Sequence, residues 1–95
     1  MENNKDLLIK VFTHPACSGC GRAVELAWNL TQEYTSLKLV TIKLENKEGL
    51  RMAHDAKIKT IPTVIYYSGE EEKIRIVGTP KGSELKDSYL KLLEN

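Results

Sequence analysis

Apolar runs of strand length alternate with segments of helical periodicity along this chain. Residues 7–12 are nearly continuously apolar, include β-branched and aromatic side chains, and predict a strand buried on both faces. Between residues 17 and 34 the apolar side chains recur at helical spacing, which predicts a helix. Residues 37–44 are rich in Leu, Val, Ile and Thr and predict a second strand. A strand, a helix and a strand in series indicate a parallel pair with a right-handed crossover.

The second half of the chain has a pattern that predicts a hairpin between two further helices. Residues 48–57 have a modest apolar face and predict a short helix. Residues 63–67 and 73–77 are strand-like and flank an acidic turn at residues 68–72, which is typical of a hairpin. An amphipathic helix over residues 85–93 follows a Gly-Thr-Pro break. The predicted order is therefore βαβαββα.

Helical spacing also predicts which large side chains pack in the core. Trp28 and Tyr34 in the first predicted helix, and Tyr89 in the last, lie at core-facing positions. Leu50 and Leu93 fall on the apolar faces of the second and third predicted helices. We interpret Trp28, Tyr34 and Tyr89 as packing residues.

Length and composition fit one globular domain of residues 1–95. The chain is 41% hydrophobic and 28% charged, which is ordinary globular composition. Its formal net charge of +1 gives little attraction for nucleic acid or an anionic membrane. The polar start at residues 1–6 does not resemble a signal peptide, and no run approaches the roughly 18 apolar residues of a membrane span. We therefore expect a soluble, cytoplasmic monomer that binds neither nucleic acid nor membrane.

Two cysteines, Cys17 and Cys20, fall where the first predicted strand gives way to the first predicted helix. Cytosolic thiols are kept reduced, so a close pair there indicates redox chemistry or metal binding. The positive end of a helix stabilises a thiolate and lowers its pKa from about 8.5, which predicts Cys17 as the attacking nucleophile. Cysteines three positions apart in a first helical turn can form a disulfide, so Cys20 is predicted to resolve the mixed disulfide. Gly19 and Gly21 carry no Cβ and allow close approach of a partner.

Metal binding is the main alternative for this cysteine pair. Zinc usually takes four ligands, and the chain has no second CxxC; His14 and His54 lie on a predicted loop and a predicted helix that nothing forces together. Residues 17–25 also resemble the CxxCxxxVE stretch of heavy-metal-associated domains, in which two thiolates bind Cu(I). Those domains follow a different order, βαββαβ. A copper or zinc carrier using the same CxxC therefore stays the second hypothesis, beside two buried structural thiols or a non-enzymatic interaction module.

Three motifs together resemble the thioredoxin and glutaredoxin superfamily over nearly the whole chain. They are Cys17-Ser18-Gly19-Cys20 after the first strand, Ile61-Pro62-Thr63 before the third, and Gly78 after the fourth. The resemblance implies a thioredoxin-like α/β fold, a four-stranded mixed sheet flanked by three helices. It also implies a cis Pro62 beside the redox pair, with Ile61, Pro62, Thr63 and Gly78 binding substrate. Without the resemblance, an X-Pro bond is cis only about 5–6% of the time, and Pro62 would simply begin a strand.

The chain departs from ordinary thioredoxins at several of these positions. Ala16 replaces their usual tryptophan, Ser18-Gly19 replaces Gly-Pro, and Val11 stands where they often bury an aspartate. Lys43 matches a lysine that partners that aspartate, and without the acid we interpret it as a solvated residue. Glutaredoxins usually show Gly-Gly and a nearby Asp after the fourth strand, whereas residues 78–83 supply only scattered glycines. Dithiols of this fold span about 150 mV, so redox potential, direction and subclass stay open.

The function predicted from the sequence is electron transfer to disulfides through a CxxC dithiol. Substrates would be protein disulfides or glutathione mixed disulfides, and the donor a thioredoxin-reductase-type protein or glutathione. The redox-active disulfide Cys17–Cys20 would serve without a metal or organic cofactor. His14 is interpreted as a solvated loop histidine; protonated and close to Cys17, it would instead help to stabilise the thiolate.

Overall fold

Seven elements follow one another in the computed structural model, which describes residues 7–94. Residues 1–6, the polar start that argued against a signal peptide, lie outside the described residues. The predicted order βαβαββα is confirmed, with the elements β1 (Leu7–Thr13), α1 (Cys20–Glu33), β2 (Lys38–Lys43), α2 (Lys47–Asp55), β3 (Thr63–Ser68), β4 (Glu71–Val77) and α3 (Glu84–Leu93).

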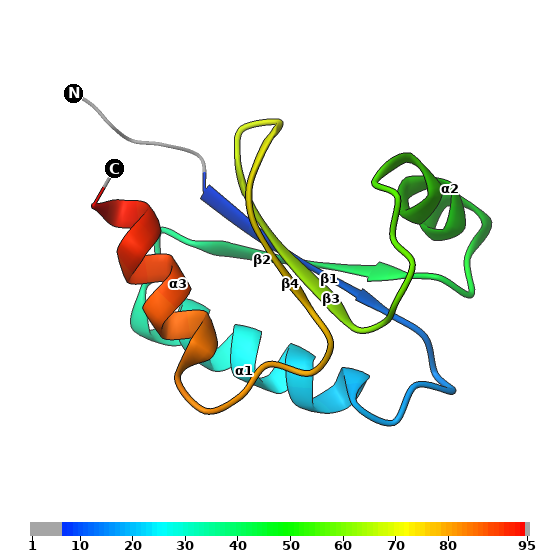
Figure 1. Cartoon of the computed structure of the whole chain (residues 1–95), viewed down its shortest axis with the longest axis horizontal. Helices are drawn as coiled ribbons and strands as arrows, with labels where there is room; N and C mark the ends of the chain where they lie inside the picture. The colour runs from blue at the N-terminus through cyan, green and yellow to red at the C-terminus, as the bar shows by residue number, and fades with distance from the viewer. Residues whose placement is uncertain (1–6, 95) are drawn as a thin grey trace.

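The four strands form one mixed sheet in the order β2-β1-β3-β4. β1 and β2 are parallel, whereas β3 runs antiparallel to both β1 and β4. Figure 1 shows α1 and α3 on one face of the sheet and α2 on the other. The arrangement is the four-stranded sheet with three helices that the sequence predicted, and β1 lies in its interior.

Two apolar clusters fill the space on either side of the sheet. Ile9 and Val11 of β1 face α1 and α3, where they join the larger cluster with Tyr66 of β3. Phe12 turns to the other face and joins Ala53 of α2 in the smaller cluster. β1 therefore buries side chains on both faces, as its continuous apolar run predicted.

Tyr66 ties α3 to the sheet. Its buried hydroxyl donates a hydrogen bond to the Leu85 carbonyl oxygen at 2.7 Å. Tyr89 lies between Tyr66 and Tyr34, with ring centroids 6.2 Å and 4.9 Å away. Burial, and next the neighbouring Tyr89, raise the pKa of Tyr66, so the hydroxyl stays protonated and keeps donating.

One of the three predicted core side chains, Trp28, is on the surface instead. Trp28 is 54% exposed, and Leu50 and Leu93 are exposed as well. α1 packs on the sheet through Ala23 and Ala27, and Trp28, one position on, points about 100° away from that face. The predictions for Tyr89, which is buried, and Tyr34, which is half-buried against it, are confirmed.

The acidic turn is shorter than predicted. β3 and β4 extend to Ser68 and from Glu71, leaving a turn of two residues in which Gly69 has a φ of +63°. Glu71 and Glu72 therefore lie in the edge strand itself. A left-handed glycine at the turn allows the strands to pair up to its ends.

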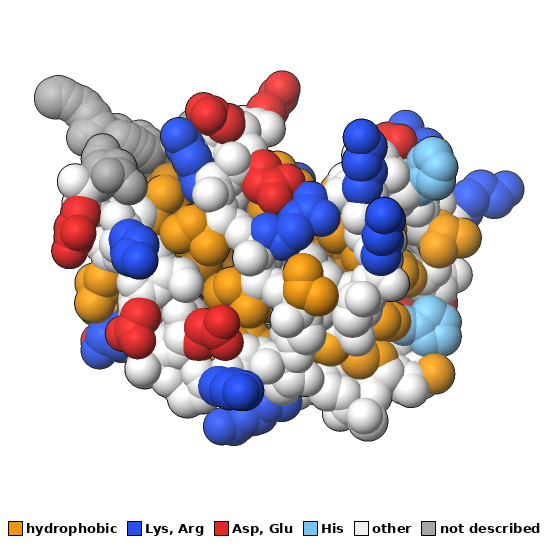
Figure 2. Space-filling view, in the orientation of Figure 1, with side chains coloured by type: hydrophobic (Ala, Val, Ile, Leu, Met, Phe, Trp, Pro, Cys, Tyr) orange, Lys and Arg blue, Asp and Glu red, His pale blue; other side chains and the backbone are white. Residues whose placement is uncertain are grey.

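No helix within residues 7–94 is long and apolar enough to cross a membrane. On the face drawn in Figure 2, acidic and basic side chains are interspersed rather than gathered by sign. Acidic and basic residues are nearly equal in number, since the formal net charge of the chain is +1.

Candidate active site

Cys17 and Cys20 are joined by a disulfide at the amino end of α1. Their Cα atoms are 5.5 Å apart. Cys20 is the first residue of the helix and only 4% exposed, whereas Cys17 is half-buried and more open to solvent. Because disulfide exchange needs access to the attacking sulfur, the geometry favours Cys17 for attack and Cys20 for resolution.

α1 begins three residues later than predicted, so the two cysteines do not share a helical turn. Cys17 lies in the preceding turn, where its N–H donates to the His14 carbonyl oxygen at 3.0 Å. Gly19 is the N-cap, and the first N–H groups of α1 have no carbonyl within the helix to bond. These groups and the helix dipole still lie beside the cysteine pair.

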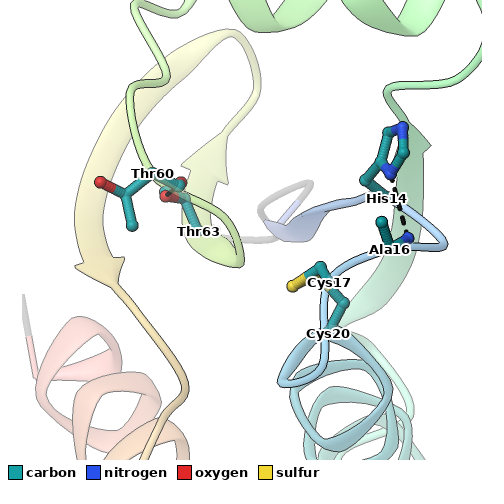
Figure 3. The surroundings of a disulfide bond; sticks show 6 residues. All are labelled: His14, Ala16, Cys17, Cys20, Thr60 and Thr63. Atoms are coloured by element: carbon teal, nitrogen blue, oxygen red, sulfur yellow. Dashed lines mark hydrogen bonds between the residues drawn. A yellow bond between two sulfur atoms is a disulfide. The ribbon is translucent and has the colours of Figure 1, made fainter.

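The corner formed by Ile61 and Pro62 lies next to this turn. The Ile61–Pro62 peptide bond is cis, and the Gly78 N–H donates to the Pro62 carbonyl oxygen at 2.8 Å. A Cβ placed on Gly19 would lie 3.8 Å from Pro62 Cδ. In Figure 3 the backbone loop that carries Thr60 and Thr63 lies opposite the loop that carries Cys17, and the Thr60 side chain points away from the cysteines. Residues distant in sequence thus meet around the disulfide.

Thr63, which the resemblance implied as a substrate contact, lies in the central part of the sheet. Its side chain is 1% exposed, and its hydroxyl donates to the Thr60 carbonyl oxygen. Its backbone pairs with Phe12 on one side and Val77 on the other. The side chain of Thr63 therefore lies inside the sheet, and Pro62 beside it is buried as well; substrate contact at these two residues stays a prediction. Ile61, by contrast, is half-exposed.

Thr79, which the sequence did not indicate as a site residue, lies against the cysteine turn. A Cβ on Gly19 would overlap the Thr79 hydroxyl, so this side chain fills the space that a larger residue would take. Gly78, whose φ is +92°, turns the chain out of β4 and brings Thr79 there. The only sequence signal was the unusual glycine at position 19, because the contact joins residues 60 positions apart.

The model of the thioredoxin family matches residues 1–91 of this chain. The chain belongs to the thioredoxin family. A chloroplastic M-type thioredoxin of Spinacia oleracea is 33% identical over 82 residues, which are 86% of this chain. They are 45% of that protein, so the chain spans about half the length of the curated relative it matches.

Solved thioredoxin structures share the fold. The oxidised thioredoxin of Plasmodium falciparum has a TM-score of 0.77 and 20% identity, covering 92% of this chain and 81% of that one. A thioredoxin from Nicotiana alata has a TM-score of 0.79 and 23% identity, covering 90% and 72%. At these identities the likeness concerns the fold alone.

This member of the thioredoxin family has an open pocket of about 600 Å³ beside its cysteines. Both cysteines line it together with Thr13, His14, Pro15, Ser18, Gly21, Val24, Thr41, Lys43 and Glu45. Val11, where thioredoxins often bury an aspartate, is fully buried in the apolar cluster under α1. Lys43 is exposed, as interpreted from the sequence.

One ring nitrogen of His14 is engaged in a local hydrogen bond. Its Nδ1 accepts a hydrogen bond from the Ala16 N–H at 3.0 Å, as Figure 3 shows. The neutral imidazole therefore carries its proton on Nε2, because the accepting nitrogen needs its lone pair. His14 still lines the pocket with Cys17, so it lies at the site rather than away from it.

Among the described residues, no further His, Cys, Asp or Glu joins the cysteine pair in a metal site of three or more ligands. Across residues 7–94, no group of three or more His, Cys, Asp and Glu side chains is placed to hold a metal ion. The side chain of His54, on α2, is 89% exposed. The observed order βαβαββα also differs from the βαββαβ order of heavy-metal-associated domains.

Proposed function

We propose that this protein reduces disulfide bonds in protein substrates through Cys17 and Cys20. The observation that carries the proposal is the pairing of an accessible Cys17 with a buried Cys20 at the amino end of α1, beside the Pro62 corner. The thioredoxin family to which the chain belongs supports the same chemistry. The dithiol carries the electrons itself, so the reaction needs no metal or organic cofactor.

The reaction is two successive thiol–disulfide exchanges. The Cys17 thiolate attacks one sulfur of the substrate, breaks its disulfide and forms a mixed disulfide, and the leaving sulfur takes a proton. Cys20 then loses its proton and attacks the Cys17 sulfur, which releases the second substrate thiol. Two electrons pass to the substrate, and the protein is left in the disulfide form seen in the structure.

The backbone at Ile61 supports an extended protein segment as substrate. Neither its N–H nor its carbonyl enters a hydrogen bond between the described residues. Unpaired backbone groups at an exposed corner can pair with an extended chain as a strand edge does. The half-exposed Ile61, with Pro62 and Gly78 beside it, is thus the proposed binding corner next to Cys17.

Reduction of insulin disulfides by wild-type and variant protein tests the proposal. We expect Cys17→Ser and Cys20→Ser both to lose turnover, because each removes one of the two exchanges. Cys20→Ser alone should accumulate a mixed disulfide with the substrate, visible by mass spectrometry. Turnover by Cys17→Ser would show that the roles are misassigned.

The donor and the compartment belong to the same proposal. We propose a cytoplasmic monomer that is recharged by a thioredoxin-reductase-type protein rather than by glutathione. The support for the choice of donor is family membership, together with the scattered glycines after β4 in place of the glutaredoxin Gly-Gly pattern. Measuring turnover with each donor, and the redox potential of the pair, decides between them; faster recharging by glutathione would contradict the choice.

A further inference from the structure

Arg75 joins edge strand β4 to the loop that leads to the Ile61–Pro62 corner. Its Nη2 donates a hydrogen bond to the Ala56 carbonyl oxygen at 2.8 Å. Its Nε and Nη2 also donate to the two carboxylate oxygens of Glu72, each at 2.8 Å. A planar guanidinium with this bidentate partner has little freedom to turn. Arg75 therefore holds the end of α2 and its following loop against β4.

The loop that Arg75 holds is fastened at both ends. At the far end, the Gly78 N–H donates to the Pro62 carbonyl oxygen at 2.8 Å, and Gly78 directly follows β4. The side chains of Ala56, Ile58 and Ile61 pack inward against the cluster under α2. The Ile61 backbone is left unpaired between these two fastenings.

We propose that Arg75 is a positioning residue for protein substrates: by anchoring Ala56, it holds the Ile61 backbone ready to pair with an extended substrate segment. The inference rests on the proposed function. Arg75 itself contacts no sulfur and needs no contact with substrate. An ordered loop avoids the entropy loss that a loose loop would suffer when substrate binds, so the anchor acts on binding.

Lys73 offers a matched control on the same strand. It lies two positions from Arg75 and pairs with Glu71 at 3.4 Å. Within the described part of the chain, neither Lys73 nor Glu71 forms a hydrogen bond or ion pair with residues 56–62. Lys73→Met thus removes a cation and an ion pair from β4 without touching the loop, whereas Arg75→Met removes the anchor and keeps an apolar stem.

The test measures KM and kcat of wild type, Arg75→Met and Lys73→Met with two substrates. One is insulin, which presents a backbone to the corner; the other is 5,5′-dithiobis(2-nitrobenzoate), a small disulfide that has none. We expect Arg75→Met to raise KM for insulin about three- to tenfold, the effect of one net hydrogen bond. Its kcat, and its rate with the small disulfide, should stay within about twofold of wild type. Lys73→Met should match wild type throughout.

Glu72→Gln provides a second variant, because it weakens the hold on Arg75 and leaves the arginine in place. It should raise KM for insulin by less than Arg75→Met does, and Arg75→Lys should recover part of the loss.

Hydrogen exchange at residues 57–61 should become faster in Arg75→Met and not in Lys73→Met. The inference fails if folded Arg75→Met has an unchanged KM for insulin, or loses activity equally on both substrates. If wild type reduces neither substrate, the proposed function fails and the inference with it.

Discussion

At the scale of single residues, Gly19 and Thr79 restrict each other across the cysteine turn. Gly19 has a helical φ of −94° and ψ of −3°, which alanine adopts without strain, so its backbone does not require glycine. What excludes a Cβ is the Thr79 hydroxyl. At Gly21, the second residue of α1, nothing lies within 4 Å of an added Cβ. An added methyl group would therefore overlap a neighbour at Gly19 and enter open space at Gly21.

We predict opposite effects of alanine at these two positions. Gly19→Ala should lower the free energy of unfolding by about 1 kcal/mol, since Thr79 must move to admit the methyl group. Gly21→Ala should raise it by roughly 0.5–1 kcal/mol, the gain in helix propensity. In a Thr79→Ala background the loss at position 19 should disappear. Urea denaturation of the disulfide form measures all four variants, and an unchanged loss in the double variant would refute the contact.

The ion pair of Glu72 with Arg75 predicts how the free energy of unfolding changes at acidic pH. The hydrogen bond with Arg75, the largest effect, lowers the pKa of the Glu72 carboxyl below its usual 4.5. The unfolded chain then binds a proton more readily, so the pair stabilises the fold fully above about pH 4.5 and less as the pH falls through the lowered pKa. Because the Glu72 side chain is 39% exposed, we expect the pair to contribute only about 0.5 kcal/mol to the free energy of unfolding. The difference in unfolding free energy between wild type and Glu72→Gln should shrink from pH 7 to pH 3; a constant difference would contradict the assignment.

At the scale of elements, α3 depends on one buried hydroxyl. Tyr66→Phe removes the donor to the Leu85 carbonyl oxygen and keeps the ring. We expect a loss of about 1 kcal/mol in unfolding free energy, because one buried hydrogen bond is lost while the Leu85 carbonyl oxygen keeps its acceptor role within α3. Tyr67→Phe, on the same strand, is the control: Lys10 Nζ lies 4.5 Å from the centre of the Tyr67 ring, which phenylalanine retains. Equal losses in both variants by urea denaturation would argue against the hydrogen bond.

The element order was predictable because strands and helices differ in the period of their apolar residues. The pattern located every strand and helix of residues 7–94, and the position of the cysteine pair followed from it. The orientation of Trp28 was not predictable, since its neighbours Ala27 and Ala23 look less apolar yet form the packed face of α1. Periodicity predicts that a helix has a packed face. Which side chains form that face depends on how closely the helix approaches the sheet.

The contacts around the site needed the three-dimensional structure. Thr79 at Gly19 and Arg75 at Ala56 join segments 60 and 19 residues apart, and neither contact has a sequence motif. Thr63 sits in a recognisable motif, yet the motif did not show that its side chain is buried between β1 and β4. Motifs identified which residues meet at the site, and packing decides which of them a partner can touch.

At the scale of the whole molecule, the sheet brings three loops to one end of α1. The turn after β1 carries Cys17, the loop before β3 carries Pro62, and the loop after β4 carries Thr79. Neighbouring strands β1, β3 and β4 set these loops side by side. The site is therefore a property of the whole fold, and the chemistry assigned to it depends on Cys17 being the reactive thiol.

Alkylation of the reduced protein with iodoacetamide across pH tests that assignment most directly. Modification should occur first at Cys17, identified by mass spectrometry, with a midpoint clearly below the value of about 8.5 for a free thiol. Earlier modification of Cys20, or a Cys17 midpoint at or above 8.5, would contradict the account.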